Sequence, residues 1–178
     1  MRFLEKDLEE IIFYSDPGQL SYRGLELQNG FLLRQVEIPN HGIADLINYV
    51  RPSKDQNYHQ VNIIELKKDL IEQSTFIQSL KYAEGIRSLF ISKGYYVKIY
   101  ITLIGRDVEA NSDFVFAPKL FKQDGLMQVN SIDFYTYSFK LSGFFFDKVN
   151  DFYRREKSKS SKVKSLSNRL IFKEKLEL

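Results

Sequence analysis

The 178-residue sequence has no cysteine, only two histidines, and no run of about eighteen apolar residues. The lack of cysteine excludes disulfide frameworks, thiolate metal sites and cysteine nucleophiles. The two histidines, His41 and His59, are too few for a multi-histidine metal centre and give a serine–histidine triad only thin support. Any metal bound here would therefore be held by oxygen ligands.

The N-terminal stretch MRFLEKDLEEIIF carries charges throughout and lacks the unbroken apolar segment of a signal peptide. We therefore expect a soluble, cytoplasmic protein without a membrane partner. The composition is 43% hydrophobic and 15% aromatic, which predicts a globular chain with a real core.

Charge is distributed unevenly along the chain. Residues 154–178 contain nine basic and three acidic residues and so carry a net charge of +6. Because the whole chain carries +3, residues 1–153 carry a net charge of −3. We predict a single domain over 1–153 and a basic, partly flexible C-terminal tail over 154–178. Such an arm is typical of a protein with a polyanionic partner, and a merely solvated terminus is the alternative. The predicted nucleic-acid-binding residues of the tail are Arg154, Arg155, Lys157, Lys159, Lys162 and Lys164.

Apolar periodicity predicts alternating helices and strands. Together these elements indicate an α/β sandwich built on a mixed β-sheet and flanked by helices. The turn-forming SDPGQ should end the first helix, and Gly94 should follow the second. The predicted helices cover 3–13 and 70–93, the strands 31–38, 43–50, 61–67 and 95–105, and a hairpin 132–149.

The stretch VNIIELKK closes an apolar run on Glu65 and Lys67. In a strand these two side chains point to the same face, so they form either a salt bridge or part of a reaction centre. Pairing between the second and third strands would bring Asp45 beside Glu65. Asp45, Glu65 and the backbone carbonyl of Leu66 would then suit Mg²⁺, with Lys67 holding or activating a water.

This ordered set resembles the PD-(D/E)xK nuclease superfamily, which includes restriction-endonuclease-like and resolvase-like members. The resemblance covers roughly residues 3–105 and departs from the motif at Ala44, where proline is expected. The residues that carry it are Glu5 in the first helix, Asp45 in GIADL, Glu65 and Lys67 in ELK, and Gln78, Lys81 and Tyr82 in FIQSLKYAEGI.

The resemblance implies a Mg²⁺-dependent endonuclease that hydrolyses DNA, with Mn²⁺ able to substitute. Asp45 and Glu65 would hold the metal, Glu5 would assist through a water, and Lys67 would orient the nucleophile. Gln78 and Tyr82 would complete the catalytic set, and Lys81 would contact nucleic acid. RNA stays open as a substrate, and cutting both strands would need a homodimer or sequential nicking.

Each assignment has a simpler alternative. Glu9 and Glu10 compete with Glu5 for the same role, and Gln78 and Tyr82 could be structural. His41 is either a loop residue or a phosphate contact. The aromatic hairpin is either core or a pairing surface. The whole chain could also be an inactive nucleic-acid-binding or assembly module in which Glu65 and Lys67 form a structural pair.

Overall fold

The computed structural model describes residues 3–54, 57–109 and 129–149. All of these except Val149 belong to one unit, which ends at Lys148. The predicted domain boundary at 153 and the basic tail, including the six cationic residues named above, lie outside the described residues.

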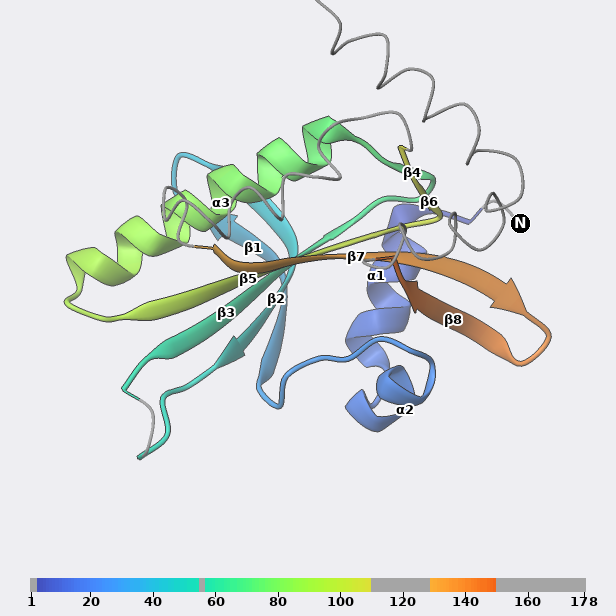
Figure 1. Ribbon diagram of the computed structural model, residues 1–178, viewed down its shortest axis with the longest axis horizontal. Coiled ribbons are helices and arrows are strands. Elements are labelled where there is room, and N and C mark those ends of the chain that lie inside the picture. The colour runs from blue at the N-terminus through green and yellow to red at the C-terminus, as the bar shows by residue number, and fades with distance from the viewer. Residues whose placement is uncertain (1–2, 55–56, 110–128, 150–178) are drawn as a thin grey trace, which may run out of the picture. The chain divides into compact units, whose positions relative to one another are not determined.

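Three helices and eight strands make up the described part of the chain (Figure 1). The helices are α1 (Glu5–Tyr14), α2 (Pro17–Tyr22) and α3 (Gln73–Ser92). The strands are β1 (Phe31–Ile38), β2 (Gly42–Val50), β3 (His59–Leu66), β4 (Leu70–Ile71), β5 (Val97–Gly105), β6 (Asp107–Val108), β7 (Val129–Lys140) and β8 (Gly143–Lys148).

Six strands form one mixed sheet in the order β1-β2-β3-β5-β7-β8. The β1–β2–β3 meander and the β7–β8 hairpin are antiparallel, whereas β3, β5 and β7 run parallel. Strands β4 and β6 form a separate parallel pair. The predicted α/β class with a mixed sheet and flanking helices is confirmed.

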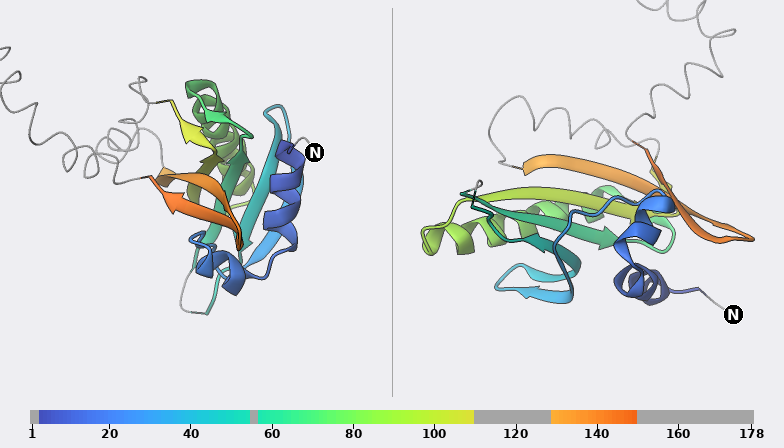
Figure 2. Two further views of the ribbon diagram at one scale, coloured as in Figure 1. Left: turned by 90° about the vertical axis from the view of Figure 1, so that its right-hand side faces the viewer. Right: turned by 90° about the horizontal axis from the view of Figure 1, so that it is seen from below.

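The helices cover opposite faces of the sheet (Figure 2). Leu8 and Ile12 of α1 belong to the same buried cluster as Leu46 and Ile64 of β2 and β3. Because side chains alternate along a strand, Ile47 and Ile63 face the other side, which α3 covers. The central strand β5 is buried over most of its length, as expected for a strand with neighbours on both sides and helices on both faces.

Two local predictions need correction. The second predicted helix begins at Gln73 rather than at residue 70, because Leu70 and Ile71 pair with β6 as a strand. The stretch SDPGQ does end α1, but it also starts α2. Asp16 accepts a hydrogen bond from the Gly18 N–H at 2.8 Å, and Pro17 occupies the first helical position.

No helix within residues 3–54, 57–109 and 129–149 has the length and apolar character needed to span a bilayer.

Candidate active site

Two carboxyl groups meet where β2 separates from β3. The β2–β3 ladder pairs Leu46 with Ile64, and Asp45 and Glu65 follow at the next position. The Asp45 N–H donates to Glu65 Oε1 at 3.4 Å, and Asp45 Oδ2 accepts from the Leu66 N–H at 2.9 Å. The structure therefore brings Asp45, Glu65 and Leu66 together, as strand pairing predicts.

Burial opposes the ionisation of both carboxyls. Glu65 is only 1% exposed. Burial and the neighbouring charge of Asp45 raise its pKa to about 8, against smaller lowering by the Asp45 N–H and Lys67. Burial also raises the pKa of Asp45, and the Leu66 N–H partly offsets this. A cation placed between the two groups would favour their ionised forms.

Lys67 lies just past the end of β3, where its N–H donates to the Ile104 carbonyl at 2.7 Å. Its Nζ is 3.6 Å from Glu5 Oε1, while Glu5 Oε2 accepts from the Lys68 N–H at 3.3 Å. Within the described residues the ion pair of Lys67 is with Glu5 of α1 rather than with the buried Glu65. The Lys67 side chain is 28% exposed.

Among the three competing acids on α1, Glu5 is the one that bonds residues directly after β3, whereas Glu9 bonds β1. Glu9 is 5% exposed, and its Oε1 lies 2.8 Å from Arg34 Nε. Its Oε2 accepts from the Gln35 amide. Glu10 pairs with Lys6 at 3.9 Å on the helix surface. Glu5 is therefore the α1 acid whose geometry suits a role beside Asp45 and Glu65.

The two α3 residues of the predicted set act on the backbone of β2. The Tyr82 hydroxyl donates to the Ile43 carbonyl at 2.8 Å, and the Gln78 amide donates to that hydroxyl. Tyr82 is 1% exposed, and burial raises its pKa. Both residues hold the strand two positions before Asp45. Lys81, on the same helix, is exposed.

His41 lies in the turn between β1 and β2. Its Nδ1 is 2.7 Å from the Pro39 carbonyl. The ring also packs against Gly85 of α3, where an added Cβ would come within 2.7 Å of the same nitrogen. The imidazole is therefore half-buried against helix and turn, which fits the loop-residue interpretation better than a phosphate contact.

The sequence did not predict that two residues of β1 line the site. Arg34 and Gln35 line a cleft of about 470 Å³ together with Glu5, Glu9 and Asp45. Gln35 has a φ of +49°, and it is the one position between Phe31 and Ile38 that is not paired with β2. In register it lies opposite Asp45. The run FLLRQVEI reads as a regular strand, so no local signal could have revealed this break.

The oxygen donors present fit a divalent metal of the Mg²⁺ type. In residues 3–54, 57–109 and 129–149 no group of three or more His, Cys, Asp or Glu side chains is arranged to hold a metal. Mg²⁺, however, is commonly bound through one or two carboxylates and keeps several waters. Asp45 and Glu65 supply such a carboxyl pair, and the Leu66 carbonyl stays a predicted third ligand.

Comparison with protein-family models, curated proteins and solved structures found no match for this chain. The arguments on function that follow therefore rest on the geometry of the site and on the sequence motif.

Proposed function

We propose that this chain is a metal-dependent endonuclease that hydrolyses DNA phosphodiester bonds on a restriction-endonuclease-like fold. One observation carries the proposal. Asp45 and Glu65 are in contact through the Asp45 N–H at 3.4 Å, and both have raised pKa values because they are buried. A carboxyl pair held at such a cost to its ionisation is typical of a functional site.

Five residues of the site have roles in the proposed reaction. Asp45 and Glu65 would hold the metal, which would supply Lewis-acid activation of the phosphodiester and of water. Lys67 orients the attacking water and stabilises negative charge that develops on the phosphate. Glu5 keeps the Lys67 ammonium in place at 3.6 Å. Tyr82, bonded to the Ile43 carbonyl at 2.8 Å, fixes the strand that carries Asp45.

A non-catalytic nucleic-acid-binding or assembly module is the second candidate. It is favoured by the Lys67–Glu5 ion pair, which gives the lysine a structural partner. It is also consistent with the lack of a three-residue metal group in the described part of the chain. In this alternative the two carboxyls would stay hydrogen-bonded to the backbone of β2 and β3, with no metal between them.

Two substitutions distinguish the candidates. Asp45→Asn removes a ligand charge and should abolish Mn²⁺ binding measured by calorimetry, along with metal-dependent cleavage of plasmid DNA. Lys67→Met should leave Mn²⁺ and DNA binding near normal but lower the cleavage rate by roughly 10²- to 10⁴-fold, because the lysine acts mainly in the transition state.

Matched controls lie next in the chain. Lys68 pairs with the exposed Asp69 at 3.7 Å, so Lys68→Met and Asp69→Asn change the same residue types nearby. Both controls should cleave at close to the parental rate. Cleavage by Lys67→Met at the parental rate would contradict the proposed mechanism. Failure of the parent to bind Mn²⁺ at millimolar concentration would favour the non-catalytic module.

A further inference from the structure

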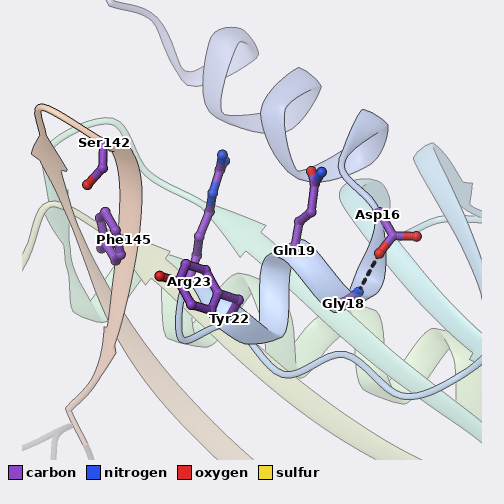
Figure 3. Close-up of a pocket in the computed structure, with 7 residues that line it drawn as sticks. All are labelled: Asp16, Gly18, Gln19, Tyr22, Arg23, Ser142 and Phe145. Carbon is purple, nitrogen blue, oxygen red and sulfur yellow. Dashed lines mark hydrogen bonds between the residues drawn. The ribbon is translucent and has the colours of Figure 1, made fainter.

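A second cavity, of about 400 Å³, lies between α2 and the β7–β8 hairpin (Figure 3). It shares no lining residue with the cleft beside Asp45. Tyr22, Arg23 and Gln19 line it from the helix side, and Ser142 and Phe145 line it from the hairpin side.

Backbone contacts fix the two walls of this pocket relative to each other. The Arg23 carbonyl accepts a hydrogen bond from the Phe146 N–H at 2.7 Å. Gly24 has a φ of +95°, and a Cβ there would lie 2.1 Å from the Phe146 carbonyl oxygen. Only glycine allows this close approach, so the end of α2 and strand β8 form one rigid frame.

The side chains that line the pocket include one cation, Arg23, one acid, Asp16, and the aromatic rings of Tyr22 and Phe145. No ion pair of Arg23 is found within the described residues. Tyr22 is 85% exposed. Phe145 is half-buried, and Lys140 Nζ lies 4.5 Å from its ring centroid. Asp16 also lines the pocket, but its Oδ1 already accepts the Gly18 N–H.

We propose that this pocket binds one nucleotide of a single-stranded nucleic acid, with the base against Tyr22 and Phe145 and the phosphate on Arg23. Bases stack on aromatic side chains, and a guanidinium bonds phosphate in a fixed geometry. Gln19 and Ser142 add polar groups for the base edge or sugar. An acidic peptide would pair with Arg23 but would make no use of the Tyr22 ring.

The inference rests on the proposed function, because the hairpin connects this pocket to the candidate active site. The Tyr137 hydroxyl of β7 donates to the Lys68 carbonyl, immediately after Lys67.

The test uses the full chain in EDTA, so that binding is measured without cleavage. A single-stranded oligonucleotide with one 2-aminopurine reports stacking by fluorescence quenching. Tyr22→Ala and Phe145→Ala should each weaken binding by roughly five-fold or more and reduce the quenching. Arg23→Gln should lower the slope of log K against log salt by about 0.7.

Arg51→Gln is the matched control, because Arg51 also lies over a phenylalanine, 5.0 Å from the Phe31 centroid, outside this pocket. It should bind as the parent does. If Phe145→Ala does not fold, as judged by thermal unfolding, Tyr22→Ala at an exposed position carries the test of stacking.

Three results would overturn the proposal. In the first, Tyr22→Ala and Arg23→Gln bind the oligonucleotide as tightly as Arg51→Gln does. In the second, Tyr22→Ala lowers the affinity for a blunt duplex more than the affinity for the single strand, and in the third, polyglutamate displaces the oligonucleotide. Its failure is distinguishable from failure of the proposed function. If the parent cleaves DNA with Mn²⁺ and the pocket variants bind the oligonucleotide normally, only the pocket proposal fails. If the parent does not cleave DNA but the pocket variants bind the oligonucleotide more weakly, only the nuclease proposal fails.

Discussion

Glu65 is the residue whose ionisation the fold opposes through burial and through the neighbouring Asp45. Its pKa rises from 4.5 to about 8 on folding. A carboxyl with a raised pKa contributes stability that is fully present below pH 4.5 and is lost as the pH rises through about 8.

Glu65→Gln should therefore stabilise the metal-free protein at alkaline pH, because glutamine needs no proton to stay neutral. Urea unfolding in EDTA should show little difference between variant and parent near pH 4.5. At pH 9 the variant should be more stable by about 2 kcal/mol or more. A difference that does not change between these two pH values would contradict the raised pKa.

Single-residue partners were the least predictable part of the site. The neighbourhood of Asp45 and Glu65 followed from strand pairing, because register fixes which positions lie opposite. The choice between Glu5 and Glu9 could not be predicted from strand pairing, because it depends on how α1 is rotated about its axis on the sheet. The partner of Lys67 escaped prediction for a similar reason: the strand ends at Leu66, so alternation no longer directs the lysine.

Strand β1 is interrupted at Gln35, whose φ of +49° lies in the left-handed region. Its amide bonds Glu9, so the deformation is tied to α1 as well as to the position opposite Asp45. Non-glycine residues in this region carry a strain of about 1–3 kcal/mol, and β-branched residues tolerate it least.

Gln35→Val should destabilise the protein by about 1–3 kcal/mol in urea unfolding, because valine strongly disfavours left-handed backbone. Glu37→Val is the control, since Glu37 is exposed on the same strand in a regular pair with Ile43. That substitution should be neutral or slightly stabilising, as valine favours strands. Equal effects of the two substitutions would mean that β1 is regular at position 35.

Long periodic elements were predictable and short ones were not. Residues 31–38 were predicted as a strand and form β1, and the hairpin follows its Ser-Gly turn. Strands β4 and β6 have two residues each and exist only because distant segments pair. Helix α2 has six residues, too few for a periodic pattern to be distinguished from a turn.

At the scale of the whole molecule, charge separates the chain into a mildly acidic part and a basic C-terminal segment. Deleting residues 157–178 removes Lys157, Lys159, Lys162, Lys164, Arg169, Lys173 and Lys175. DNA affinity should fall, and the salt slope should flatten by about 0.7–0.9 for each phosphate that the shortened chain no longer neutralises. Fluorescence anisotropy at several salt concentrations measures both.

A full-length variant with glutamine at these seven positions is the control for chain length. It should reproduce the fall in affinity if charge is responsible. An unchanged salt slope in both variants would show that residues 157–178 do not bind phosphate.

The connection between α1 and the strand ends also has an entropic consequence. Asp45 and Glu65 are 20 residues apart, whereas the Glu5–Lys68 hydrogen bond closes a loop of 63 residues. Loop-closure entropy grows with the logarithm of length, so the longer closure costs about 1 kcal/mol more. The carboxyl pair is thus brought together by two strands that are close in sequence, whereas Glu5 lies 63 residues before its partner Lys68. Local detachment of α1 would separate Glu5 from Lys67 while the hydrogen-bonded sheet, and with it the carboxyl pair, stayed intact.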